Sequence, residues 1–158
     1  MTRKNLADIL KATVIGVGIF GAVIYLAAFP LIARELPPLS DSTSLRALWL
    51  AFVLTSSLPC YVTLVLLWRA ATRISRGELF CLKNAHSLKR ISYLAAADSA
   101  FVFLGNIALF FTKSSPLALF LVLLFFAFIG IFATVVFAVL SHIVARGCEL
   151  QEQSDLTI

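Results

Sequence analysis

Four long stretches without charge divide this chain, and they limit how it can fold more than any other feature. Apart from Asp98, charged side chains are absent from residues 12–33, 47–68, 91–112 and 114–145. An α-helix needs about 20 apolar residues to cross the ~30 Å hydrocarbon core of a bilayer. Each stretch can therefore form one membrane span. None of them shows the alternating segments of about ten residues that are typical of a membrane β-barrel.

The composition excludes a water-soluble fold. The chain has 158 residues, of which 61% are hydrophobic and 13% are charged. Soluble domains average about 45–50% apolar and about 25% charged residues. A chain of this length has too small an interior to remove so much apolar surface from water. We therefore expect an integral membrane protein, and not a soluble enzyme, a disordered chain or a disulfide scaffold.

We expect a single all-α membrane domain over residues 1–158, folded as an antiparallel four-helix transmembrane bundle. The expected spans are residues 12–33, 45–68, 92–112 and 117–141. The first is longer than the apolar run of about 7–15 residues in a cleaved signal peptide, so we expect it to be retained. Trp49 and Trp68 lie about 28 Å apart along a helix, a spacing that matches the two aromatic belts of a bilayer.

The basic residues predict the orientation of the spans. Only three Lys or Arg residues lie in the first and last loops, namely Arg34, Arg46 and Lys113. The other ten lie near the termini and in the middle segment: Arg3, Lys4, Lys11, Arg69, Arg73, Arg76, Lys83, Lys89, Arg90 and Arg146. Because cytoplasmic loops are rich in Lys and Arg, we expect both termini and the middle segment in the cytoplasm. The net charge of +5 then faces anionic lipid, and we expect no direct binding of nucleic acid.

The middle segment is predicted to form a cytoplasmic helical hairpin between the second and third spans. The helical pattern continues past Trp68 to Arg76, and Gly77 suits a left-handed C-cap. A new helix is expected near Cys81, running directly into the third span. The last helix is expected to continue past Arg146.

Three glycines in the first stretch match a nucleotide-binding pattern that the context excludes. Gly16, Gly18 and Gly21 spell G-x-G-x-x-G, but that motif needs a preceding strand and a βαβ unit. Here it lies inside an apolar run. We expect close helix packing instead, through the pairs Ala12/Gly16 and Gly18/Ala22.

Polar residues within the spans are the candidates for intramembrane chemistry. Asp98 is the only acidic residue in any span, and burial there costs at least ~2.5–3.5 kcal/mol, so we expect it to have a partner. The expected partners are His142 and Arg146 on the last span. Asn106 is expected to bond a hydroxyl of the second span, that of Thr55, Ser56 or Ser57. Two interpretations remain open: hydrogen bonds that join helices, and a proton or ion relay.

We expect no enzyme, because the chain lacks the arrangements that hydrolytic chemistry needs. It has no second intramembrane acid, no H-E-x-x-H motif and no serine with a base at helical spacing. Its three cysteines, Cys60, Cys81 and Cys148, show no metal-binding spacing. No cofactor, metal or catalytic residue is therefore predicted.

The middle segment contains Arg73, Arg76, Gly77 and Phe80, followed by Asn84, Leu88 and Arg90. This pattern shows a resemblance to a family of small bacterial four-span membrane proteins, catalogued as domain of unknown function 2975. The ending Asp155-Leu156-Thr157-Ile158 strengthens it, although Ser154 stands where the family usually has Asn. The resemblance implies a bacterial inner membrane. It also implies a gene that often neighbours one for a small Cro/C1-type helix-turn-helix regulator.

Two functions follow as hypotheses. The first is a regulatory or anchoring protein that binds a soluble cytoplasmic partner, such as that regulator. Its docking residues would be Arg73, Arg76, Gly77, Phe80, Asn84, Leu88, Arg90, Asp155 and Leu156. The second is a small transporter or channel subunit that uses Asp98, Asn106 and His142. The lipid bilayer is a partner in both, and a second copy of the chain stays open as another.

Overall fold

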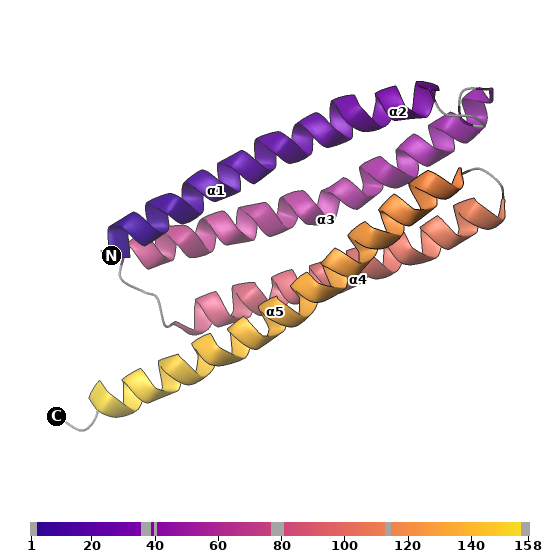
Figure 1. Cartoon of the computed structure of the whole chain (residues 1–158). Helices are drawn as coiled ribbons and strands as arrows, with labels where there is room; N and C mark the ends of the chain where they lie inside the picture. The colour runs from indigo at the N-terminus through magenta and orange to yellow at the C-terminus, as the bar shows by residue number, and fades with distance from the viewer. Residues whose placement is uncertain (1–2, 36–38, 40, 77–80, 113–114, 156–158) are drawn as a thin grey trace.

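The computed structural model describes residues 3–35, 39, 41–76, 81–112 and 115–155, and every regular element among them is helical (Figure 1). The elements are α1 (Arg3–Val23), the π-helical turn η1 (Ile24–Ala28), α2 (Phe29–Glu35), α3 (Thr43–Ser75), α4 (Leu82–Phe111) and α5 (Leu117–Asp155). Because α1, η1 and α2 follow one another without a break, they form one continuous rod. With α3, α4 and α5, the described residues form four helical rods.

All four rods are long and apolar enough to cross a membrane. Their candidate spans are Ala7–Glu35, Thr43–Ser75, Leu82–Phe111 and Leu117–Gln153. The predicted spans fall inside these helices, except that Thr112 is the C-cap residue of α4. The prediction of an all-α, four-span membrane protein is therefore confirmed, and the chain is a multi-pass membrane protein.

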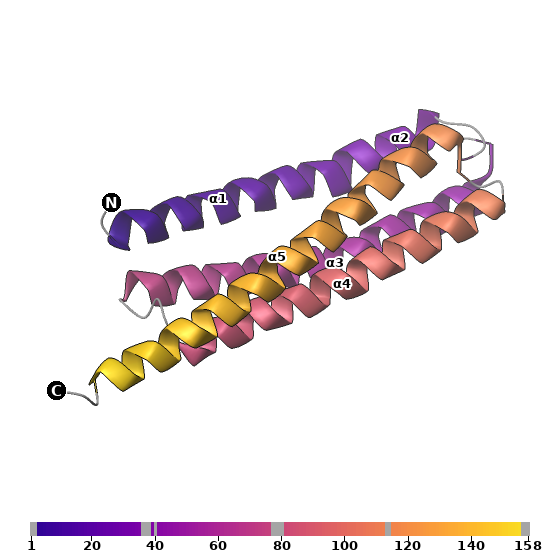
Figure 2. The ribbon, with the colours of Figure 1, turned by 60° about the horizontal axis from the view of Figure 1, so that its bottom comes forward.

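The four rods form two antiparallel hairpins that lie side by side (Figures 1 and 2). One hairpin joins the rod of α1 and α2 to α3, and the other joins α4 to α5. The two hairpins meet where α3 packs against α4. In the described part of the chain, no Cα atom of α1 comes within 8 Å of α4 or α5. The backbones of α1 and α5 are therefore not in contact.

The two ends of the bundle differ in charge. We call the end where α1 begins, α3 ends, α4 begins and α5 ends the basic end, since ten of the 13 Lys and Arg residues belong to it. Both chain termini lie at this end (Figure 1). The opposite, far end carries the turns from α2 to α3 and from α4 to α5.

A cluster of buried apolar residues lies toward the far end. Its members come from four helices and the first turn, and are Phe29, Ala33, Leu39, Trp49, Val53, Leu109 and Leu119. The Trp49 side chain is 0% exposed, and its ring meets that of Phe29 edge-on with centroids 5.7 Å apart. The prediction that Trp49 belongs to a lipid-facing aromatic belt is therefore wrong. Its spacing from Trp68 sets its depth along the helix, but not the side on which it lies.

Trp68 does lie on an exposed face near the basic end. Its side chain is 40% exposed, and the Lys11 Nζ lies 5.7 Å from the centroid of its ring. A cation over an indole ring is attracted by the negative face of the ring. This contact ties the first turns of α1 to the last turns of α3.

A π-helical turn keeps the first rod continuous ahead of Pro30. The Phe29 N–H donates to the Ile24 carbonyl, five residues back. Proline has no N–H to donate, so the normal pattern of hydrogen bonds is interrupted at residue 30. Wide turns of this kind restore backbone hydrogen bonding beside such an interruption, and this matters most in lipid.

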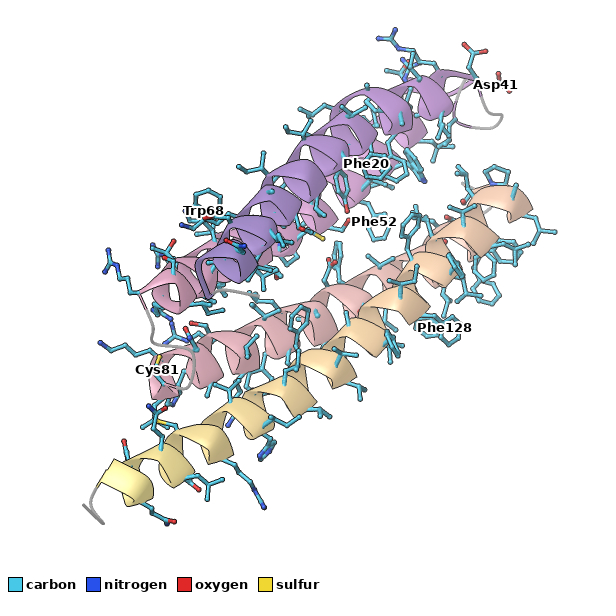
Figure 3. All side chains as sticks on the ribbon, turned by 60° about the vertical axis from the view of Figure 1, so that its left-hand side comes forward. Phe20, Asp41, Phe52, Trp68, Cys81 and Phe128 are labelled. Atoms are coloured by element: carbon cyan, nitrogen blue, oxygen red, sulfur yellow. The ribbon has the colours of Figure 1, made fainter. Side chains whose placement is uncertain are left out.

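Two glycines allow helices to approach closely, and neither belongs to the first span. A Cβ atom added to Gly105 of α4 would overlap the ring of Phe52, which projects from α3 into the space between the hairpins (Figure 3). A Cβ atom on Gly130 of α5 would overlap the Ser99 hydroxyl of α4. These positions fix the separation of α3 from α4 and of α4 from α5.

The glycines of the first span contribute less to helix packing than the sequence predicts. The Gly18 carbonyl accepts a hydrogen bond from the Tyr61 hydroxyl at 3.3 Å, so this position does face α3. A Cβ atom on Gly16 would have nothing within 4 Å, and Ala12 is exposed. The predicted packing through the pair Ala12/Gly16 is therefore wrong, because those residues lie on the outer face of the helix.

Replacing Gly105 with alanine should destabilise the protein, whereas the same change at Gly16 should not. Both variants gain the same helix propensity, so their difference isolates the overlap with Phe52, which we expect to cost about 1–3 kcal/mol. Thermal unfolding in detergent, followed by circular dichroism, measures this difference. If G105A is as stable as G16A, Phe52 does not pack against Gly105.

Candidate functional site

Three polar side chains from three helices meet within the spans. The Cys60 thiol of α3 lies 3.8 Å from Oδ2 of Asp98 on α4 and donates a weak hydrogen bond to it. The Tyr25 hydroxyl of η1 lies 4.0 Å from the same sulfur. This cluster of Tyr25, Cys60 and Asp98 links the first rod, α3 and α4.

The cluster lines a cavity of about 250 Å³. All four rods contribute to its wall, including Ser56 of α3, Ser99 of α4 and Gly130 of α5. Oδ1 of Asp98 is buried and has no hydrogen-bond partner among the described residues. Asp98, the single acid of the spans predicted from the sequence, therefore faces the interior of the bundle, with one oxygen unpaired.

The predicted contact of Asp98 with His142 or Arg146 is wrong. Ser99 contacts Gly130, so Asp98 lies opposite the middle of α5. His142 follows Gly130 by 12 residues, which is about 18 Å along a helix. Both His142 and Arg146 are exposed near the basic end. Antiparallel order alone did not reveal how far α5 runs past α4.

The predicted partner of Asn106 is also wrong. Its side chain is 0% exposed, and Nδ2 donates to the Phe120 carbonyl of α5 at 2.9 Å. The hydroxyls expected to meet it donate instead to carbonyls of their own helix, those of Thr55 to Ala51, Ser56 to Val53 and Ser57 to Leu54. Asp98, Asn106 and His142 thus lie in three separate environments.

At the basic end, Arg73 joins the two helices of the predicted hairpin. The two N–H groups of its Nη1 are shared by three acceptors, the Lys83 carbonyl at 3.2 Å, Oδ1 of Asn84 at 3.3 Å and Oγ of Ser87 at 3.0 Å. Asn84 and Ser87 are buried. The sequence motif therefore contains the contact that holds the end of α3 against the start of α4.

The other predicted docking residues have different environments. Arg76 and Arg90 are exposed, and Leu88 is half-buried. Asp155 is the last residue of α5. Gly77, Phe80 and Leu156 lie outside the described residues. The helical hairpin itself is confirmed, because α3 ends at Ser75 and α4 begins after its N-cap residue, Cys81.

The last turns of α5 project beyond the start of α4. Leu82 of α4 and Ala145 of α5 line the same groove, and α5 continues as a helix to Asp155 (Figures 1 and 2). The expected continuation past Arg146 is confirmed, and Gly147 does not end the helix. On this projecting part, Leu150 is 66% exposed and lies near the exposed Glu149 and Glu152.

The groove between α4 and α5 is a feature that the sequence reasoning missed. It encloses about 450 Å³ and is lined by His86, Lys89 and Tyr93 of α4 and by Ser141 and His142 of α5, among others. His86 was not among the predicted residues. The spacing of three and four residues between its lining positions on each helix was the available signal.

Comparison with known proteins identifies the family. The chain belongs to the family described as "Protein of unknown function (DUF2975)", whose model matches residues 32–158. This confirms the resemblance found in the middle segment and the tail. Comparison with curated proteins and with solved structures finds no significant match.

Replacing Arg73 with glutamine should loosen the start of α4. The change removes the charged donor that binds three groups there. A buried hydrogen bond to a charged group contributes about 1.5–3 kcal/mol to stability. We expect a smaller contribution here because Arg73 is partly exposed. We expect amide hydrogen exchange over residues 82–88 to become about tenfold faster. Arg76→Gln, at an exposed position one turn away, is the control and should change nothing. Equal exchange in the two variants would contradict the role of Arg73.

Proposed function

We propose that this DUF2975 protein is a non-enzymatic regulatory protein of the bacterial inner membrane that binds a soluble protein at its basic end. The proposal places that end in the cytoplasm, because Lys and Arg concentrate on the cytoplasmic side of membrane proteins. It assigns the spans to anchoring and the projecting end of α5 to recognition.

The projecting end of α5 is the observation that carries the proposal. A continuous helix that extends past its neighbour presents side chains whose positions are fixed before a partner arrives, which lowers the entropic cost of binding. The exposed Leu150 supplies an apolar contact between two acidic residues, Glu149 and Glu152. Helical recognition commonly uses such an apolar anchor with charged neighbours.

The charge of this surface favours a basic partner. Anionic lipid repels acidic side chains, so Glu149 and Glu152 have no reason to lie on the membrane. A small helix-turn-helix regulator carries a basic face for DNA, and this face is complementary to the end of α5. On this proposal, the membrane protein would compete with DNA for the regulator.

The transporter hypothesis receives less support from the geometry. Asp98 lines the central cavity, Asn106 is fully buried against Phe120, and His142 is exposed in the groove at the basic end. A transport path needs polar groups that follow one another across the bilayer. These three do not form such a series.

Recovery of a soluble partner from native membranes tests the proposal. The tagged full chain should retain a helix-turn-helix protein, identified by mass spectrometry, and Leu150→Glu should reduce its recovery at least about tenfold, as expected for loss of an interface anchor. Gln151→Glu adds the same charge at the adjacent exposed position and should retain the partner. Recovery of a larger permease instead, or equal recovery with L150E, would overturn the proposal.

The orientation is tested in the same cells. Cys148 is only 8% exposed and is a poor target for a labelling reagent. Gln151→Cys places a thiol on an exposed position of the same helix. An impermeant maleimide should label it only after the cells are permeabilised. Labelling in intact cells would place the basic end outside the cytoplasm.

A further inference from the structure

We infer that the cavity at Asp98 binds a small apolar molecule that carries an amine. This site lies within the spans, apart from the proposed docking surface at the end of α5. The inference rests on the size of the cavity, on the chemistry of its wall and on its position between the first rod and α5.

The size of the cavity sets the size of the ligand. An engineered apolar cavity of about 150 Å³ holds one benzene molecule. In proportion, the 250 Å³ of this partly open cavity accommodates about ten non-hydrogen atoms. This is a single ring with a short chain, much smaller than a phospholipid.

Most of the wall is apolar. Phe29, Phe52 and Val53 contribute from the first hairpin, and Val102 and Leu123 contribute from the second. Phe52 extends from α3 toward the second hairpin (Figure 3), where its ring lies 5.1 Å from that of Phe101. A wall of this kind favours a hydrocarbon or aromatic body.

One acceptor in the wall lacks a donor. Among the residues that the structure describes, Oδ1 of Asp98 is buried and unpaired, and Oδ2 has only the weak Cys60 thiol. Among the nearby hydroxyls, that of Tyr25 contacts the Cys60 sulfur and makes no bond to Asp98. Ser99 donates to the Ala95 carbonyl, and Ser56 donates to that of Val53. An unpaired buried carboxyl oxygen is costly. A ligand that donates an N–H bond to it removes that cost, whereas a ligand carboxylate or phosphate would be repelled.

The ligand reaches this cavity from the bilayer. Gly21 and Ile24 line it from the first rod, and Phe126 and Ile129 line it from α5. The backbones of α1 and α5 do not meet in the described chain. An amine with an apolar body partitions into the membrane and can enter between them. Once bound, it contacts both hairpins and can alter how they pack.

A matched pair of fluorinated probes tests the inference on the full chain in non-ionic detergent. The amine is 2-(4-fluorophenyl)ethylamine, and its isostere without nitrogen is 1-fluoro-4-propylbenzene. In ¹⁹F NMR titrations, the amine should bind saturably and at least about tenfold more tightly than the isostere, because one bond is charge-assisted. Equal affinity of the two probes would overturn the inference in favour of a purely apolar site.

Three variants test whether the amine binds in the cavity at Asp98. Asp98→Asn should remove the preference for the amine, whereas Asp8→Asn, an exposed position on α1, should keep it. Val102→Phe fills part of the cavity and should weaken both probes. Unchanged amine binding by V102F, or an unchanged preference in D98N, would place the site elsewhere.

A measurement on the unaltered chain covers the case in which a variant does not fold. Cys60 lines the cavity and is exposed enough to react, and Cys81 lies at the basic end. The amine should slow alkylation of Cys60 by N-ethylmaleimide at least severalfold and leave the rate at Cys81 unchanged. Equal rates at Cys60 with and without the amine would overturn the inference.

Discussion

The absence of water from the hydrocarbon core is the constraint on which the rest of this structure depends. Polar groups must be paired within the protein, and most hydroxyls of the spans do this on their own helix, as Thr13, Thr55 and Thr134 do. Among the described residues, few bonds cross between helices. Two of them set the register of α4 against α5, from Ser92 to the Thr134 carbonyl and from Asn106 to the Phe120 carbonyl.

The unequal packing of the two hairpins produces both candidate sites. Within the second hairpin, α4 and α5 are held by Gly130 at Ser99 and by the two bonds just described. The hairpins are joined through α3 and α4, at Phe52 and Gly105 and again at Arg73. Because the backbone of α1 stays apart from those of α4 and α5 in the described chain, a cavity remains beside Asp98. Because α5 is longer than α4, its end projects as an exposed helix.

Features that depend on one helix were predictable, whereas features that depend on two were not. Apolar length predicted the four spans, and the pattern around Arg76 and Cys81 predicted the hairpin between α3 and α4. Spacing in the sequence gives depth but not the side of a helix, so Trp49 was misplaced. It also does not give the register between helices, so the partners of Asp98 and Asn106 were wrong. The cavity needs four helices and had no signal in the sequence.

The register of the helices places Asp98 beside Cys60 in the middle of the bundle, away from His142. Cross-linking of native Cys60 to a cysteine introduced at residue 98 or 142 tests this register. Cys81 and Cys148 are replaced by serine, and a protease site is placed within residues 77–80. After a short bismaleimide is added to membranes, the two halves of D98C should stay joined on cleavage, and those of H142C should separate. A cross-link from Cys60 to residue 142 but not to residue 98 would contradict this structure.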